Sequence, residues 1–403
     1  MANKPRIRFR GFTEDWEQRK LGDLYKRVNE RNDGTLGRDK WISVAKMYFQ
    51  DPDKVQSNNL DTRTYVMKKG DIAFEGHPNN EFKFGRFVLN DIGTGIISEL
   101  FPIYRPITEY DLDFWKYAIQ LERVMAPILA KSITSSGNSS NKLDHNHFLN
   151  KELLVPNIEE QKKIGTLLSL LSKNITLHQC KLKKLNLAKK SLLQKLFPRN
   201  GSQIPGVRFK GFTDAWEQRK LGDIATFSKG NGYSKSDLAP SGDPIILYGR
   251  LYTNYETTIR NVDTFVELKD KSVISQGDEV IVPASGETVE DISRASVVKD
   301  QGVIIGGDLN VIKVNHLLDP TFLALTISNG EQQKELSKRA QGKSVVHLHN
   351  SDLQEVNLTF PLLNEQKEIS TLFEKMDSII TLHQRKLERL QEVKKGLLQK
   401  MFV

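Results

Sequence analysis

The sequence is poor in the features that mark secreted, membrane-spanning or cysteine-ligated metal proteins. Cys180 is the only cysteine among 403 residues, which excludes internal disulfide bonds and zinc sites built from cysteine pairs. No apolar run approaches the roughly 18 residues of a membrane span. The N-terminal stretch MANKPRIRFRGF lacks the apolar segment of a signal peptide. We therefore expect a cytoplasmic protein.

Motifs of covalent chemistry are also missing. The sequence holds no G-x-S-x-G, no H-E-x-x-H, no glycine-rich dinucleotide motif and no Asn/Asp-Pro-Pro-aromatic motif of adenine methyltransferases. The stretch QGKSVV at residues 341–346 lacks a phosphate loop's first glycine, because Ser337 stands at that position. Asp144, His145 and His147 are metal-ligand types, but the corresponding LHNSDL segment does not repeat them. We predict no catalytic residue, no cofactor-binding residue and no metal site.

The charge of the chain is unbalanced toward the basic side. Lys and Arg number 59 against 50 Asp and Glu, and the formal net charge is +9. Such a balance favours a polyanionic partner such as nucleic acid. The length suggests two or three domains, and a hydrophobic content of 38% is ordinary for a globular protein.

Two internal repeats divide the chain into two copies of one plan. Residues 8–24 and 208–224 are identical at 13 of 17 positions, and residues 156–197 resemble residues 361–402. The segments between the repeats, about 25–155 and 225–360, share only traces. This is the pattern expected of a duplicated scaffold whose two halves are set to different targets.

The second repeat predicts two long helices. Apolar residues recur in alternating steps of three and four over residues 160–197 and 365–402, which is typical of a coiled coil. The domain between the helices should have its termini close together, so we expect the helices to run antiparallel. The predicted register pairs Leu171 with Leu387 and Leu185 with Phe373. The first helix carries nine lysines and one acid, the second eight basic and six acidic residues.

The predicted fold is therefore α+β, with a pseudo-two-fold internal repeat. Two α/β-mixed domains lie at opposite ends of an antiparallel two-helix coiled coil. The expected divisions are residues 1–155 for the first domain, 156–200 for the first helix, 201–360 for the second domain and 361–403 for the second helix.

The repeated motifs resemble those of a known family. A W-E-x-x-K-L-G-D head occurs at Trp16 and at Trp216, and a P-x-x-x-E-Q-K-x-I start of a long helix occurs at Pro156 and at Pro361. Each brackets a divergent domain. The doubled arrangement covers essentially the whole chain and is similar to the specificity subunits of type I restriction–modification enzymes.

The resemblance implies a non-catalytic, DNA-binding function. In that family each divergent domain is a target recognition domain that reads one half of a bipartite sequence in double-stranded DNA. The helices set the spacer and dock two methyltransferase subunits, and restriction subunits with translocase and endonuclease activity join the complex. S-adenosylmethionine, ATP and Mg²⁺ would belong to those partners.

Candidate DNA contacts come from polar and basic loops, because Arg, Lys, Asn and similar side chains read base edges. In the first domain these loops lie at residues 76–87 and 135–142; in the second they lie at 248–255, 283–294 and 341–347. Trp16 and Trp216 are expected to pack the heads instead. The predicted DNA-binding residues are Lys46, His77, Asn79, Asn80, Lys83, Arg86, Asn138, Lys142, Arg250, Tyr252, Arg294 and Lys343.

Two other functions remain open from the sequence. A coiled-coil adaptor that binds only protein predicts no sequence-selective DNA binding even with partners present. A self-contained DNA methyltransferase or nuclease predicts activity of the isolated chain with S-adenosylmethionine, and the missing motifs argue against it.

Overall fold

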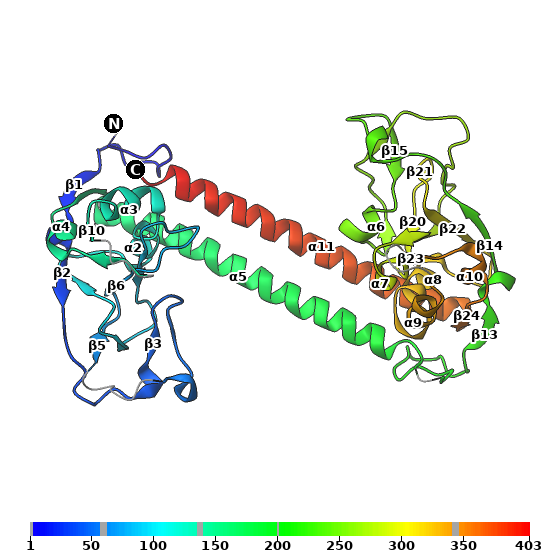
Figure 1. The fold of residues 1–403 in the computed structure, drawn as a ribbon, viewed down its shortest axis with the longest axis horizontal. Coiled ribbons are helices and arrows are strands. Elements are labelled where there is room, and N and C mark those ends of the chain that lie inside the picture. The colour runs from blue at the N-terminus through cyan, green and yellow to red at the C-terminus, as the bar shows by residue number, and fades with distance from the viewer. Residues whose placement is uncertain (1–2, 57–62, 135–139, 200, 341–345) are drawn as a thin grey trace. The chain divides into compact units, whose positions relative to one another are not determined.

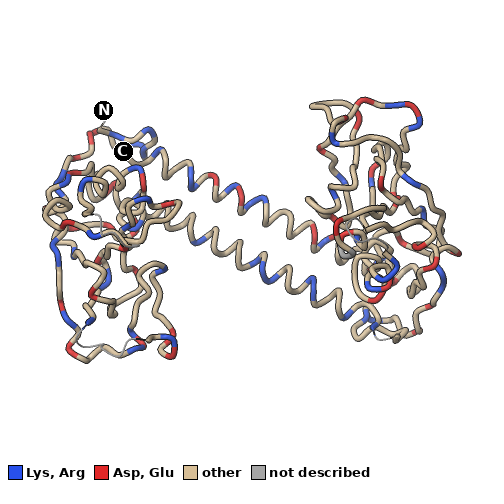
Figure 2. The backbone as a smooth tube through the Cα atoms, in the orientation of Figure 1, with Lys and Arg blue, Asp and Glu red and all other residues tan. Residues whose placement is uncertain are grey.

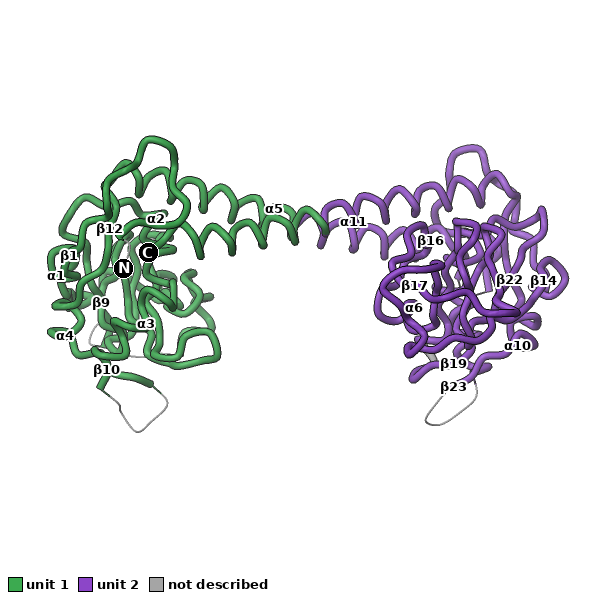
Figure 3. The backbone as a smooth tube through the Cα atoms, turned by 90° about the horizontal axis from the view of Figure 1, so that it is seen from above, with its two compact units in different colours: residues 1–179, 385–403 green, residues 180–384 purple. Residues whose placement is uncertain are grey.

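The computed structural model describes residues 3–56, 63–134, 140–199, 201–340 and 346–403. The chain divides into two compact units (Figure 3). Unit 1 comprises residues 1–179 and 385–403, and unit 2 comprises residues 180–384. Both units mix α and β structure (Figure 1). Within the described residues, no helix combines the length and apolarity needed to cross a membrane.

The repeated heads fold as the same small β-ladder in both units. In unit 1, β1 (Glu17–Lys20) pairs antiparallel with β12 (Glu152–Val155), and in unit 2, β13 (Glu217–Lys220) pairs antiparallel with β24 (Asn357–Phe360). A short helical turn follows each first strand, α1 (Leu21–Leu24) or η3 (Leu221–Asp223). Trp16 and Trp216 are 4% and 1% exposed. The expectation that both tryptophans pack the heads is confirmed.

The central sheet of unit 1 is antiparallel and four-stranded, in the order β2 (Tyr25–Val28), β9 (Ile103–Pro106), β6 (Ile72–Glu75), β7 (Arg86–Leu89). All four residues of β6 are buried, as expected for an inner strand. Paired short strands surround this sheet: β3 (Ile42–Ser43) with β4 (Tyr48–Phe49), β5 (Thr64–Met67) with β8 (Gly95–Ser98), and β10 (Ile133–Thr134) with β11 (Lys142–Leu143). The helical elements are η1 (Arg38–Lys40), η2 (Pro52–Lys54), α2 (Leu112–Ala118), α3 (Glu122–Leu129) and α4 (His145–Leu149).

Unit 2 has a five-stranded sheet in the order β14 (Ala225–Lys229), β22 (Leu309–Val314), β18 (Glu279–Pro283), β20 (Ser296–Val298), β16 (Thr258–Ile259). A separate sheet comprises β17 (Phe265–Val266), β15 (Asp243–Ile246) and β21 (Ile304–Ile305), and β19 (Ser285–Gly286) pairs with β23 (Val346–His347). The helical elements are η4 (Lys235–Asp237), α6 (Arg250–Thr253), α7 (Val289–Ile292), α8 (Pro320–Ile327), α9 (Gly330–Arg339) and α10 (Asn350–Gln354).

The inner strands of the two sheets are equivalent residue by residue. Ile72 of β6 lies opposite Tyr104 and Leu89, and Val280 of β18 lies opposite Ile312 and Val297. All three positions differ by 208 residues between the units. The same offset relates Asp111 to Asp319, which cap the N-termini of α2 and α8 by accepting hydrogen bonds from Phe114 N and Phe322 N. The duplication therefore extends into the segments whose sequences have diverged.

The two long helices are α5 (Ile158–Lys195) and α11 (Leu363–Lys400), each 38 residues long. They begin two residues before Glu160 and Glu365, where the predicted heptad pattern starts. In unit 1, the start of α5 and the end of α11 enter one core, which contains Ile164, Leu168 and Met401. In unit 2, the last residues of α5 pack with the start of α11 in the core of Leu196, Phe373 and Met376.

The predicted register of the two helices is wrong by about one heptad. Leu185 was expected opposite Phe373, a pair whose numbers sum to 558. In unit 2, Phe373 instead shares a core with Leu192, and Lys189 pairs with Asp377 at 2.5 Å. The numbers of that ion pair sum to 566, about one heptad more than predicted. The reason is that apolar residues beyond the helix ends, Phe197 and Phe402, are fixed in the unit cores.

The start of each long helix is tied to the head of its own unit by buried polar contacts. Glu160 accepts hydrogen bonds from Arg8 at 2.8 and 2.7 Å and from Trp16 Nε1 at 3.1 Å. Gln161 accepts from Asp111 N and donates to Pro156 O. Unit 2 repeats the arginine and glutamine contacts with Glu365, Arg208, Gln366, Asp319 and Pro361, whereas Trp216 Nε1 is buried without a hydrogen-bond partner among the described residues. The Glu-Gln pair of the repeated motif is thus part of the scaffold.

Candidate nucleic-acid interface

Four of the predicted DNA-binding residues lie on one exposed loop of unit 1, between β6 and β7. His77, Asn79, Asn80 and Lys83 are all exposed. Asn79 shapes the loop, because its side-chain oxygen accepts hydrogen bonds from Glu81 N and Phe82 N at 2.9 Å. Lys83 N donates to Glu122, and its ammonium lies 5.6 Å from the Phe84 ring centre. The structure therefore brings these four together.

The base of this loop holds a buried carboxylate. Glu75, the last residue of β6, is 7% exposed. His77 Nδ1 lies 2.8 Å from Glu75 Oε1, and Arg86 Nε lies 3.4 Å from Oε2. Arg86 also donates to Ala45 O at 2.6 Å and stacks over Phe82 at 5.0 Å. Arg86 was predicted to contact DNA, and the structure places it half-buried between Glu75 and Phe82.

Two more predicted residues flank this loop. Lys46 is exposed in the turn between β3 and β4, beside a cavity of about 340 Å³ that is also lined by Arg86, Asp91 and Lys116. Lys142 is exposed at the start of β11, and its neighbour Asn141 donates from N to Gly76 O at 2.9 Å. The predicted residue Asn138 lies outside the described residues.

The two predicted contacts near α6 of unit 2 are engaged inside the unit. Arg250 is 12% exposed and pairs with Asp263 at 2.7 Å and Glu256 at 2.9 Å. The Tyr252 hydroxyl donates to Ser285 O, and burial raises the pKa of this phenol well above its usual range. The sequence predicted neither the ion pairs of Arg250 nor the hydrogen bond of Tyr252. A DNA contact by either residue stays a prediction.

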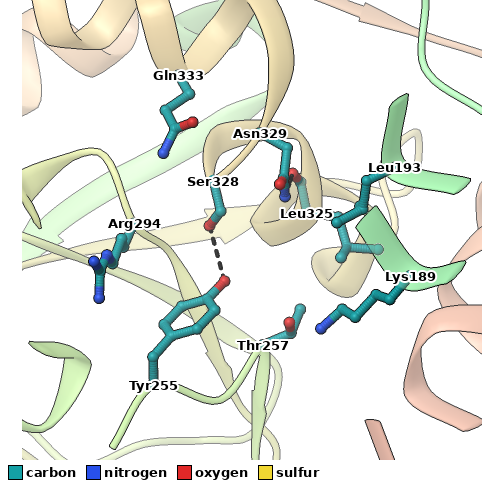
Figure 4. Close-up of a pocket in the computed structure, with 9 residues that line it drawn as sticks. All are labelled: Lys189, Leu193, Tyr255, Thr257, Arg294, Leu325, Ser328, Asn329 and Gln333. Atoms are coloured by element: carbon teal, nitrogen blue, oxygen red, sulfur yellow. Dashed lines mark hydrogen bonds between the residues drawn. The ribbon is translucent and has the colours of Figure 1, made fainter. Parts of the chain in front are cut away.

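Arg294 lies beside a small polar cavity of unit 2 (Figure 4). Its guanidinium is 3.5 Å from Asp291 and 5.9 Å from the Tyr255 ring centre. The cavity, about 120 Å³, is also lined by Lys189, Ser328 and Gln333. Tyr255 donates to Ser328 Oγ at 3.1 Å, as the dashed line shows. The predicted residue Lys343 lies outside the described residues.

The electrostatic character of the long helices differs strongly. Beyond its first turn, α5 carries lysines and no acidic residue, whereas acidic and basic residues alternate along α11 (Figure 2). A lysine-rich face is suited to phosphate contacts that carry no sequence information.

The described residues contain no group of three or more His, Cys, Asp or Glu side chains placed to hold a metal ion. The Asp144 cluster has other partners. Asp144 caps α4 by accepting from His147 N at 2.9 Å, and His145 Nδ1 lies 2.6 Å from the Tyr104 hydroxyl.

Sequence reasoning missed Glu75, the buried residue that organises the first loop. Its signal was a carboxylate at the end of an otherwise apolar strand, IAFE, just before the polar loop. A buried carboxylate is costly without partners, so such a residue indicates a nearby cation or ring N–H.

Comparison with known proteins gives consistent results. A family model described as the type I restriction modification DNA specificity domain matches residues 213–392. The type I restriction enzyme MjaVIII specificity subunit of Methanocaldococcus jannaschii is 20% identical, over 96% of this chain and 91% of that protein. A provisionally named MjaX specificity subunit of the same organism is 23% identical, over 96% and 92%.

The fold has a solved counterpart. The crystal structure of the S subunit of a type I restriction-modification system from M. genitalium aligns with a TM-score of 0.61 at 14% identity, over 99% of both chains. The family match falls in the second half of the chain, and the repeated head and helix start extend its motifs to the first half. Residues 213–392 thus match the DNA specificity domain of type I restriction–modification systems, and the chain is similar over 96% of its length to specificity subunits of such systems.

Proposed function

We propose that each divergent domain, residues 1–155 and 201–360, is a target recognition domain that reads one half of an asymmetric bipartite DNA sequence. The observation that carries this proposal is the unequal divergence of the two copies. Head ladders, helix caps and buried Arg–Glu pairs repeat contact for contact, while the loops between the equivalent strands differ in sequence: residues 76–85 read GHPNNEFKFG and residues 284–293 read ASGETVEDIS. A constant scaffold with variable loops is suited to two different half-sites.

The proposal gives the long helices, residues 156–200 and 361–403, two further functions. As an antiparallel coiled coil they hold the half-sites at a fixed separation, as dimer geometry does for two-fold DNA-binding proteins. They also dock two methyltransferase subunits, and restriction subunits join through that complex. S-adenosylmethionine, ATP and Mg²⁺ then bind in the partners, and this chain supplies specificity without catalysis, in the cytoplasm.

Methylation sequencing tests the proposal directly. The chain is co-expressed with its cognate methyltransferase subunit, and the methylated adenines of a plasmid are mapped. We expect one asymmetric motif with a split of unspecified bases. Replacing residues 25–155 by those of another such domain should change one half of the motif and leave the other unchanged.

Two results would contradict it. If the complex assembles and no methylation follows, a protein-only adaptor becomes the better account. If the isolated chain transfers labelled methyl groups from S-adenosylmethionine, the chain is itself an enzyme.

A further inference from the structure

We propose that Glu75 is a positioning residue that fixes the ring of His77, and that His77 thereby determines one base of the half-site read by unit 1. This inference rests on the proposed function and adds a residue and a chemical preference to it. It combines the burial of Glu75, the geometry of the loop and the absence of the same arrangement in unit 2.

The ring of His77 is held at one end and free at the other. Its side chain is 57% exposed, while the Glu75 side chain is 9% exposed. Glu75 Oε1 is 2.8 Å from His77 Nδ1 and accepts a second hydrogen bond from His77 N at 3.3 Å. An exposed histidine without such an anchor would sample several side-chain rotamers. Here the anchored nitrogen leaves Nε2 as the atom available to a ligand.

The backbone beneath the histidine is also closely packed. A side chain at Gly76 would meet Asn141 O at 2.2 Å, and one at Gly85, where φ is +83°, would meet Glu75 O at 2.6 Å. The two ends of the loop therefore lie against each other and against Asn141, the residue that precedes β11. A recognition residue needs such rigid support, because a loosely held side chain discriminates poorly between ligands.

The fold itself does not need a carboxylate at this position. The offset of 208 that relates β6 to β18 places Pro283 at the position of Glu75 and Ser285 at that of His77. Pro283 is buried and uncharged in an equivalent strand. A buried ion pair is commonly no more stable than an apolar packing of similar volume. The Glu75 arrangement is thus a property of one recognition domain rather than of the scaffold.

The chemistry of the pair sets the expected base. The tautomer of His77 that donates its Nδ1 proton to Glu75 presents Nε2 as a hydrogen-bond acceptor. In the major groove the base-edge donors are the amino groups of adenine N6 and cytosine N4. His77 should therefore select a base with an amino group, adenine or cytosine.

The test uses the chain in complex with its methyltransferase subunit and reads the methylated motif of the whole genome. His77→Ala is the deciding variant, because an exposed side chain can be truncated without disturbing the core. We expect an adenine or cytosine position in one half-site to relax, with discrimination falling about five- to tenfold. Glu75→Gln should weaken discrimination at the same position, and the other half-site should keep its sequence.

A double variant tests whether Glu75 acts by positioning His77 or makes its own direct contact with DNA. If Glu75 acts through His77, the Glu75→Gln/His77→Ala variant relaxes the motif no further than His77→Ala alone. His147→Ala is the matched control, since His147 is 68% exposed and lies 3.6 Å from Asp144 in the same unit. It should leave the motif unchanged. Co-purification of each variant with the methyltransferase subunit verifies assembly.

Three outcomes overturn the inference. The first is that His77→Ala leaves every position of the motif intact, with or without a uniform loss of methylation that would indicate a phosphate contact. The second is that the relaxed position is a guanine or a thymine. The third is that Glu75→Gln and His77→Ala relax different positions. By contrast, a wild-type complex that methylates no split motif contradicts the proposed function itself.

Discussion

At the residue scale, the buried Arg–Glu pairs join each head to its long helix. Glu365 and Arg208 have side chains 2% and 11% exposed, and Glu160 and Arg8 repeat them at 1% and 11%. The paired carboxylate raises the pKa of each guanidinium. Glu365→Gln leaves the Arg208 charge buried without its counter-ion. We expect the free energy of unfolding of unit 2 to fall by about 3–5 kcal/mol, measured by urea denaturation.

The duplicated structure supplies the controls for this measurement. Glu160→Gln should destabilise unit 1 by a similar amount, because the same arginine contacts recur there. Glu159→Gln neutralises an adjacent carboxylate that is 68% exposed, and should change stability by less than about 0.5 kcal/mol. Equal urea midpoints for Glu365→Gln and the wild type would show that the pair is not needed.

His145 gives unit 1 a pH-dependent stability. Burial lowers the pKa of His145, and the nearby cation of Arg27 lowers it further. The folded state therefore favours the neutral ring. Above pH about 6.5 both folded and unfolded forms are neutral, and below it the unfolded chain binds a proton that the folded chain resists. Stability should fall as the pH drops below about 6.5, by at most about 1.4 kcal/mol per pH unit.

The comparison of His145→Gln with wild type isolates this effect. Urea midpoints of unit 1 between pH 7.5 and 5 should decline less steeply in the variant. His147→Gln, which changes a histidine that is 68% exposed, should follow the wild-type curve. Parallel curves for wild type and His145→Gln would contradict the assignment.

At the element scale, residues just beyond the long helices anchor them. Phe402 stacks on Phe114 with ring centres 5.3 Å apart, and Phe197 stacks on Phe322 at 5.5 Å. Both are nearly buried. Phe402→Ala should destabilise unit 1, and Phe197→Ala unit 2, each by about 3–5 kcal/mol.

Hydrogen exchange distinguishes these two effects. Phe402→Ala should lower the protection of α2 and leave that of α8 unchanged, and Phe197→Ala should do the reverse, because the rings belong to separate cores. Leu100→Ala, at a side chain 82% exposed, is the neutral control. Equal loss of protection in both units from one substitution would show that the cores are coupled.

The sequence predicted elements well where one pattern is sufficient to define them. The heptad spacing indicated both long helices to within two residues, since an apolar stripe is a local property. The predicted pairing register of the two helices was wrong by about one heptad. Registers that differ by one heptad bury similar apolar stripes, and the choice between them is made by Phe197 and Phe402, which lie beyond the ends of the helices. Arg250 shows the same difficulty at a site. The sequence around an arginine in a polar loop looks the same whether the side chain binds DNA or, as here, forms ion pairs with Asp263 and Glu256.

At the scale of the whole molecule, the proposed function makes the helices a ruler. A heptad inserted in both helices, after Gln179 and after Gln384, keeps the apolar stripe in phase and adds about 10.5 Å to each. That length corresponds to about three base pairs, which also rotate DNA by roughly 100°. A rigid ruler of the new length cannot meet both original half-sites. We therefore expect methylation at the original spacing to disappear, as read by methylation sequencing of the assembled complex.

Any motif that the lengthened chain does methylate should keep both half-sites and differ only in its spacer. A seven-residue insertion after Gly34, in an exposed loop of unit 1 where φ is +89°, is the matched control and should preserve the original spacing. If the double insertion assembles with the methyltransferase subunit and still methylates the original motif, the helices do not set the distance. The spacing would then be fixed by the partner subunits, and the constant lengths of α5 and α11 would serve docking alone.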